Sequence, residues 1–342
     1  MPCYEPLEAY EVSNDWIHKN NGKKYIAFPN EAESIPRKYK KQIQLPCGQC
    51  IGCRLLYSVN WATRIMHEVQ TTSNQTACFI TLTYNDKNIP KDYSLNKHHL
   101  QDFIKRFRFA ISPIKIRYFA CGEYGDTTWR PHYHAIIFGY DFTKLQKYHK
   151  EIHQPRVQMQ YLPTENPYFL STFLTELWPY GNHIITNCNY DTAAYVARYC
   201  VKKINGEKKD QHYNRLIIDW NEFTGEIYNM QEVDLEQEFS LMSRGGKGAD
   251  GIQLKGIGNQ WYKKYKTDCY PSNYLLKDGN KIPIPKYYDS ILEQEDKIMF
   301  SAMKVKRELA IVNRADDLTP EMLNKRHYCK QVQYKQLVRN KI

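Results

Sequence analysis

The stretch Arg130–Gly139 reads RPHYHAIIFG and places two histidines one residue apart in an apolar run rich in β-branched and aromatic residues. This composition is typical of a β-strand. Successive strand side chains point to opposite faces, so we expect His132 and His134 on one face and Tyr133 and Ala135 on the other. Two adjacent imidazoles are suited to binding a metal ion, although such a pair also occurs as an ordinary structural feature.

The flanking segments predict the rest of the fold. We expect a strand at 79–84, a helix capped by Ser94 with its apolar side chains near 100–107, strands at 114–123 and 130–139, a helix from Pro167, and a strand at 183–186. This β-α-β-β-α-β order predicts an α+β protein with a split βαβ, ferredoxin-like core, in which one antiparallel sheet carries its helices on a single face.

A further helix is expected after Asp191 or Thr192, either of which can cap it, and it runs to about Lys203. Tyr195 and Tyr199 are four residues apart and therefore share one helix face. Each is followed three residues later by a cation, and these cations are Arg198 and Lys202. Such a face is either a half-buried packing surface or a pair of nucleophiles with cationic neighbours.

The composition is that of a basic protein with 342 residues, a net charge of +11 and 28 tyrosines. These properties suit a polyanionic partner with bases that can stack on aromatic rings. No apolar run approaches the ~18 residues of a membrane helix, so we expect no membrane association and a cytoplasmic location. We divide the chain into an N-terminal arm at 1–60, a core at 61–205 and a mostly helical extension at 206–342.

Three cysteines of the N-terminal arm have C-x₂-C-x₂-C spacing, namely Cys47, Cys50 and Cys53, and Cys3 offers a fourth thiolate. One interpretation is a structural zinc site. A second is that these are small buried residues at the start of a helix that continues to Ile65. An iron-sulfur cluster is a third, although its usual spacing would put a fourth cysteine close by.

Three motifs together resemble a known family: FITLTY at 79–84, RPHYH at 130–134 and YVARYCVK at 195–202. In this order they resemble the replication initiators of the HUH endonuclease superfamily, and most closely those of microvirus single-stranded DNA phages of the gokushovirus branch. Weaker similarity extends to 46–54, 241–244 and 256–258.

The resemblance implies that His132 and His134 hold a divalent ion, Mg²⁺ or Mn²⁺, against a phosphodiester of single-stranded origin DNA. It implies that a tyrosine attacks the phosphorus, leaving a 5′-phosphotyrosine and a 3′-hydroxyl that primes rolling-circle replication. Two tyrosines imply alternation, so that the second nicks and rejoins the released strand. Lys202 is expected to assist, with Arg198 as the alternative.

Two histidines leave a metal under-coordinated, so a third ligand is expected. Glu123 ends the strand that pairs with the histidine strand, which makes it our first choice ahead of Asp126 and Asp86. No ATPase motif is visible, so a host helicase and a host DNA polymerase are expected partners in the cytoplasm of a bacterial host. The rival functions are a non-catalytic binding module for single-stranded nucleic acid with structural histidines, and a metalloenzyme that hydrolyses DNA with water.

The C-terminal extension predicts a hairpin within 213–228 and basic helices from about 290 onward. The basic helices either contact DNA or host replication proteins, or are ordinary solvated helices.

Overall fold

The computed structural model describes residues 3–13, 15–16, 25–125, 128–143, 157–161, 167–199, 208–220, 224–247 and 253–336. The chain divides into two compact units, one of Ser58–Met303 and one of Met1–Tyr57 with Lys304–Ile342. Across these described ranges, every helix is too short or too polar to span a bilayer.

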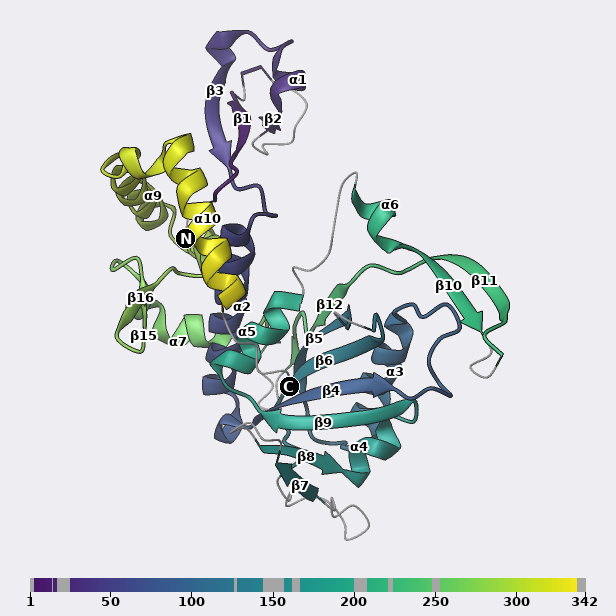
Figure 1. The fold of residues 1–342 in the computed structure, drawn as a ribbon. Helices are drawn as coiled ribbons and strands as arrows, with labels where there is room; N and C mark the ends of the chain where they lie inside the picture. The colour runs from purple at the N-terminus through teal and green to yellow at the C-terminus, as the bar shows by residue number, and fades with distance from the viewer. Residues whose placement is uncertain are drawn as a thin grey trace. The chain divides into compact units, whose positions relative to one another are not determined.

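The larger unit is built on a seven-stranded antiparallel sheet in the order β12-β5-β6-β4-β9-β8-β7 (Figure 1). Its strands are β4 (Ala77–Tyr84), β5 (Arg117–Tyr124), β6 (Pro131–Phe138), β7 (Val157–Tyr161), β8 (Pro167–Ser171), β9 (Gly181–Asn187) and β12 (Phe239–Met242). The expected α+β class, the antiparallel sheet and the hairpin of the histidine strand are therefore confirmed.

Two helices cover one face of the sheet, α3 (Lys97–Ala110) and α4 (Thr172–Leu177). Phe103 of α3 and Leu174 of α4 are fully buried in a cluster that also contains Tyr133 and Ile137 of β6. This cluster is the larger core of the unit, and it removes the apolar stripe of each helix from water.

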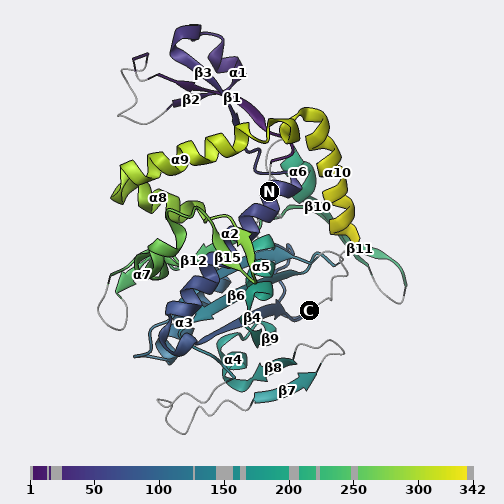
Figure 2. The ribbon, with the colours of Figure 1, turned by 90° about the vertical axis from the view of Figure 1, so that its left-hand side faces the viewer.

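The opposite face is covered by α2 (Ile51–Thr71) and α5 (Tyr190–Tyr199), which lie side by side in Figures 1 and 2. Ile65 of α2 and Val196 of α5 are buried with Phe79 and Ile136 in a second cluster. Our expectation that helices lie on a single face was therefore wrong. The reason is that β4 and β6 carry large apolar side chains on both faces, and each face needs cover.

Helix α3 begins two residues later than its predicted cap implies. The side chain of Asn96 accepts hydrogen bonds from the backbone N–H groups of His98 and His99, so Asn96 is the N-cap. The predicted cap, Ser94, instead accepts a hydrogen bond on its Oγ from the backbone N–H of Glu236, 2.8 Å away. The contact with Glu236, which is distant in sequence, therefore explains why Ser94 does not cap the helix.

The segment after Pro167 is strand β8 rather than the start of a helix, because it pairs with β7 and meets β9 at Phe169 and Ile185. Ser171 then caps α4 by accepting from the backbone N–H of Leu174.

Helix α5 also starts differently, because neither predicted cap is used. The Asn189 side chain accepts from the Thr192 N–H, and the Thr192 hydroxyl accepts from the Asn189 N–H, both at 2.9 Å. This reciprocal pair satisfies donors at the helix start.

The remainder of the larger unit contains the predicted hairpin, whose second strand extends to Asp234. The extension begins with one short helix, continues mainly as β structure and becomes helical later, so it is less uniformly helical than expected. Its elements are α6 (Lys208–Tyr213), β10 (Asn214–Trp220), β11 (Ile227–Asp234), β13 (Gly246–Lys247), β14 (Gln253–Leu254), α7 (Asn259–Cys269), β15 (Leu275–Lys277), β16 (Asn280–Ile282) and α8 (Lys286–Glu295).

The smaller unit contains a three-stranded sheet in the order β2-β1-β3, with a small core that includes Val12 and Ala27. Its elements are β1 (Leu7–Val12), β2 (Tyr25–Ala27), α1 (Pro29–Ala32), β3 (Lys40–Leu45) and α10 (Pro320–Gln336), together with the start of α2 and the end of α9 (Lys297–Val312).

Candidate active site and cysteine cluster

Strand pairing brings a carboxylate to the histidine strand. Glu123 of β5 lies opposite His132 of β6, and Cys121 lies opposite His134. The Glu123 Oε1 atom is 2.7 Å from Nε2 of His134, and both side chains are almost completely buried. Burial makes this contact stronger than it would be in water, because fewer water molecules compete for either group.

The second ring nitrogen of His134 also has a partner. Its Nδ1 atom is 2.9 Å from the hydroxyl of Thr81, which lies directly opposite His134 on β4. Phe79 stacks on the same imidazole, with ring centroids 5.6 Å apart. The hydroxyl and the phenyl ring hold the orientation of His134 from two sides, so Nε2 stays directed at Glu123.

His132 lies beside this pair, and its ring centroid is 6.1 Å from that of His134. The backbone of Gly125 passes close to it, because a Cβ built there would lie 3.2 Å from Cε1 and Nε2 of His132. Any larger residue at 125 would therefore crowd this ring. Among the described residues, the one group of ligating side chains that converges closely enough to hold a metal ion is the cysteine cluster described below.

The two rival acidic residues differ from Glu123. Asp86 is exposed and forms an ion pair with Arg130. Asp126 lies outside the residues that the structure describes. Among the described acidic residues weighed from the sequence, Glu123 is the one that contacts a histidine of the pair.

Helix α5 is held over this face by contacts on two sides. Ala193, Val196 and Ala197 are fully buried. The Ser58 hydroxyl of α2 donates a hydrogen bond to the Ala194 carbonyl at 2.9 Å, and the Cys121 thiol contacts the Val196 carbonyl at 3.8 Å. These contacts set both the position of α5 and the direction of its remaining face.

That remaining face presents Tyr195 to the histidine strand. The Tyr195 ring meets the His134 imidazole edge-on, with centroids 5.4 Å apart and an interplanar angle of 85°. The guanidinium carbon of Arg198 lies 5.9 Å from the Tyr195 ring centroid. Tyr199 is the last residue of α5, its side chain is outside the described set, and so is Lys202. The structure thus brings together Tyr195, Arg198 and the buried His134–Glu123 pair.

Our sequence reasoning assigned no role to three residues of this site: Phe79, Thr81 and Gly125. The sequence did carry a signal for Phe79 and Thr81, because they are two positions apart on a predicted strand and therefore share a face. What was missing was the pairing of β4 with β6, which puts Thr81 opposite His134. Gly125 had no local signal beyond its place in a turn.

The chain is similar to several known proteins. Residues 77–204 match the family model of replication-associated protein ORF2/G2P. Replication-associated protein VP4 of Bdellovibrio phage phiMH2K is 27% identical over 341 residues, which cover 95% of this chain and 89% of the relative. The chain is related to microvirus-type phage replication-associated proteins.

Two further replication-associated proteins support this relationship. ORF2 of Spiroplasma virus 4 is 26% identical over 322 residues, covering 90% of this chain and 86% of the relative. ORF4 of Chlamydia phage 1 is 30% identical over 253 residues, which cover 73% of this chain and 54% of the relative. No solved structure matches the chain significantly. The range matched by the replication-associated family model runs from β4 to beyond α5, and so includes every residue of the candidate active site.

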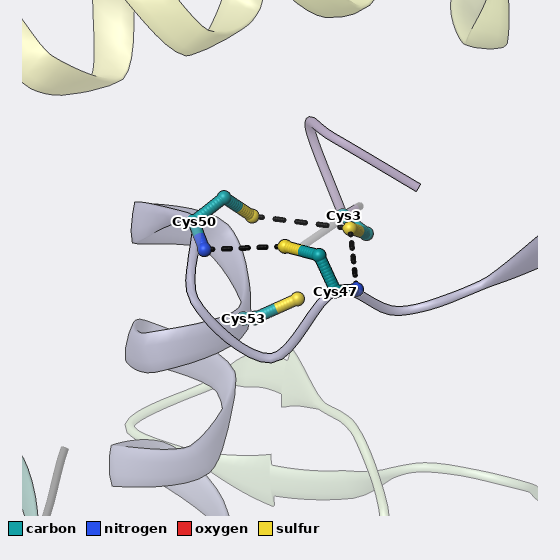
Figure 3. Close-up of side chains that lie close together, drawn as sticks. All are labelled: Cys3, Cys47, Cys50 and Cys53. Atoms are coloured by element: carbon teal, nitrogen blue, oxygen red, sulfur yellow. Dashed lines mark hydrogen bonds between the residues drawn. The ribbon is translucent and has the colours of Figure 1, made fainter. Parts of the chain in front are cut away.

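A second cluster of chemically active side chains lies outside that range, in the smaller unit. The thiols of Cys3, Cys47, Cys50 and Cys53 converge, with all four sulfur atoms within 4.8 Å of one another (Figure 3). Burial raises the pKa of Cys50, but hydrogen bonds from backbone and neighbouring thiols outweigh it and lower that pKa to about 7. Burial has the larger effect at Cys47 and Cys53, and it raises the pKa of both thiols. This cluster is able to bind a metal such as zinc.

Proposed function

We propose that this protein is a replication initiator that nicks single-stranded DNA at a viral origin and stays joined to it through a tyrosine. The observation that carries this proposal is the position of Tyr195 against His134, whose Nε2 atom is hydrogen-bonded to a buried carboxylate. The names of the relatives, which are replication-associated proteins of phages, support a role in DNA replication.

The proposal includes a HUH-type, ferredoxin-like core. Four strands of the sheet lie side by side in the order β5-β6-β4-β9. Numbered along the chain, this is the order two, three, one, four, which a split βαβ unit adopts when helices follow its first and third strands. Helices α3 and α4 take those two places, whereas β7 and β8 are an insertion before α4.

We assign His132, His134 and Glu123 as ligands for Mg²⁺ or Mn²⁺. Two imidazoles and a carboxylate are a suitable donor set, and Thr81 supports His134 as a hydrogen-bond partner normally supports a metal-bound histidine. When bound, a divalent ion would polarise a phosphate oxygen and stabilise the charge that develops on it. The protein residues supply the other parts of the reaction.

The Tyr195 oxygen attacks the phosphorus, so that a bond from Tyr195 to phosphorus forms and the bond to the 3′ oxygen breaks. The phenol loses its proton, and the departing 3′ oxygen takes one up and becomes a hydroxyl. A tyrosine has a pKa of about 10, so it is mostly protonated at neutral pH. A cation beside it favours the phenolate. Arg198 is the described cation next to Tyr195, and Lys202 is the second candidate for this role.

Tyr199 is the proposed second nucleophile. It follows Tyr195 by four residues in the same helix, which is the spacing of two positions on one helix face. Two nucleophiles allow the second to nick a regenerated origin while the first still holds the earlier strand, which then rejoins its own 3′ end. We further propose that a host helicase and a host DNA polymerase act with the protein in the bacterial cytoplasm, because a nick yields a primer but separates no strands.

The decisive experiment mixes the full chain with single-stranded origin DNA and Mn²⁺ or Mg²⁺ and looks for an adduct stable to heat and detergent. We expect adduct with the native chain, less with Tyr195→Phe, and none with the double variant Tyr195→Phe, Tyr199→Phe. The matched control is Tyr190→Phe on the same helix, whose ring instead lies 4.0 Å from the Lys277 ammonium. We expect full adduct from this control.

Other outcomes would reject the proposal in different ways. Adduct that survives in the double variant would reject the tyrosine assignment. Cutting without an adduct would indicate hydrolysis by water, and retarded mobility without cutting would indicate a binding module. His132→Ala should prevent cutting yet leave most DNA binding, because phosphate contacts dominate affinity.

A further inference from the structure

The four cysteines of the smaller unit come from two separate places in the chain. Cys3 precedes β1, whereas Cys47 and Cys50 follow β3 and Cys53 lies in the first turn of α2. Figure 3 shows their sulfur atoms directed at a common centre. The Cys3 and Cys50 sulfur atoms are 3.9 Å apart. A disulfide has a sulfur to sulfur distance of about 2 Å, so this pair is not bonded.

The spacing matches a single tetrahedral ion. Zinc binds thiolate sulfur at about 2.3 Å, which puts the sulfur atoms of a regular tetrahedron about 3.8 Å apart. The Cys3 to Cys50 distance agrees with this value, and all four sulfur atoms lie within 4.8 Å of one another. An iron-sulfur cluster places several metal atoms between its thiolates and therefore needs a wider cage.

Every one of the four sulfur atoms accepts a backbone N–H. Cys47 donates to Cys3 and Cys50 donates to Cys47, both at 3.2 Å, and Tyr4 donates to Cys50 at 3.3 Å. The Gly48 backbone hydrogen-bonds to Cys53. Backbone donors directed at sulfur hold each ligand in position and partly offset the negative charge of a metal-bound thiolate. Ordinary buried thiols would pack among apolar side chains without this set of donors.

The loop between Cys47 and Cys50 has the backbone that this arrangement requires. Gly48 has a φ of +75°, a conformation that favours glycine, and the turn there brings Cys47 and Cys50 to the same centre. Helix α2 begins directly after Cys50, so the positive end of its dipole faces the sulfur atoms.

We propose that Cys3, Cys47, Cys50 and Cys53 bind one structural zinc ion. The ion joins the N-terminal segment to the start of α2. It also supports α10, because Tyr4 stacks on His327 with ring centroids 5.2 Å apart and Leu323 packs in the same cluster. The sheet of this unit has a small core, and a metal supplies stability that such a core lacks.

The first test is the metal content of the full chain, purified without chelator and measured by mass spectrometry of the elements. We expect about one zinc per chain, and a loss of most of it in Cys50→Ser. Cys329→Ser is the matched control, because Cys329 is exposed on α10 and outside the cluster. This control should retain its zinc. A native chain without stoichiometric metal, or one with iron and sulfide, would overturn the proposal.

The second test uses the native chain, so it does not depend on how a variant folds. Co²⁺ exchanged into a site of four thiolates gives a sulfur to metal charge-transfer band and the visible bands of a tetrahedral ion. We expect both bands in the native chain and in Cys329→Ser. Cys3→Ser, which changes only the N-terminal ligand, should weaken the charge-transfer band. Octahedral Co²⁺ without such a band would reject the site. Neither test involves DNA. The zinc proposal can therefore fail while nicking is observed, and nicking can be absent while zinc is bound.

Discussion

The Tyr195 ring lies edge-on against the His134 imidazole, with centroids 5.4 Å apart. One residue belongs to a helix and the other to a central strand, and their contact depends on how α5 packs across β5 and β6. His134 is also bonded to Thr81 and Glu123. The tyrosine, the imidazole and the carboxylate therefore form one connected unit, and this unit can be tested by changing its parts separately.

Thr81→Val removes the hydroxyl on Nδ1 of His134 while keeping the shape of the side chain. We expect the Mn²⁺ concentration needed for half-maximal adduct formation to rise by about 10 to 100-fold, as for other hydrogen-bond partners of ligating histidines. A Mn²⁺ titration of the adduct assay measures this. Thr81→Ser retains the hydroxyl and should stay near the native value. Equal effects of the two changes would mean that Thr81 acts by packing alone.

Glu123→Gln keeps the size of the side chain and removes its charge. We expect the rate of adduct formation to fall by about 100-fold or more. Loss of a ligand weakens the binding of a metal ion that contributes several kcal/mol to catalysis. The rate of adduct formation at fixed Mn²⁺ is the measurement. Asp86→Asn is the matched control, since Asp86 is acidic but paired with Arg130 at the surface. A large loss in the control with none in Glu123→Gln would reassign the third ligand.

Ile136→Ala tests the core beneath α5. Ile136 is fully buried in the cluster between the sheet and helices α2 and α5, so its truncation should cost about 2 to 5 kcal/mol in the free energy of unfolding. Urea denaturation measures this cost. Ile218→Ala in the β10–β11 hairpin should cost at most about 0.5 kcal/mol, because that side chain is exposed. If Ile136→Ala lost as little free energy of unfolding as Ile218→Ala, the cluster beneath α5 would contribute little to stability.

Two buried histidines make stability depend on pH. Burial lowers the pKa of His67 to about 3 and that of His183 to about 4, and His183 Nε2 accepts a hydrogen bond from the Ser171 N–H. Because the unfolded chain protonates near pH 6.5, the stabilisation is complete above that pH. It is lost as the pH falls towards the folded values, by about 2 kcal/mol per histidine between pH 7 and pH 5.

His183→Gln offers the same kind of acceptor to Ser171 but does not titrate. Urea denaturation at pH 7 and pH 5 should show a decrease in stability that is smaller by about 2 kcal/mol than in the native chain. An unchanged decrease would mean that His183 takes up its proton in the folded protein at the same pH as in the unfolded chain.

Much of the local structure was predictable because its signals are local. Alternation along 79–84 and 130–139 indicated the two strands, and both are present as β4 and β6. Errors occurred where distant contacts decide. The apolar residues after Pro167 fit a helix as well as a strand, and pairing with β7 and β9 selects the strand. Likewise, the Ser94 hydroxyl is bonded to Glu236, so Asn96 caps the helix.

The same division applies to the candidate site. Chain periodicity placed His132 and His134 on one strand face and Tyr195 and Tyr199 on one helix face, and the hairpin indicated Glu123. Only the long-range packing decided that these faces meet, and that Thr81 lies behind His134.

The sequence by itself therefore determined the composition of each face, because the periods of strands and helices are properties of neighbouring residues. The tertiary structure alone decided which faces contact one another, that helices cover both sides of the sheet, and that Cys3 joins the three later cysteines. The physical reason is that burial of apolar surface depends on residues far apart in the chain, which no local pattern specifies.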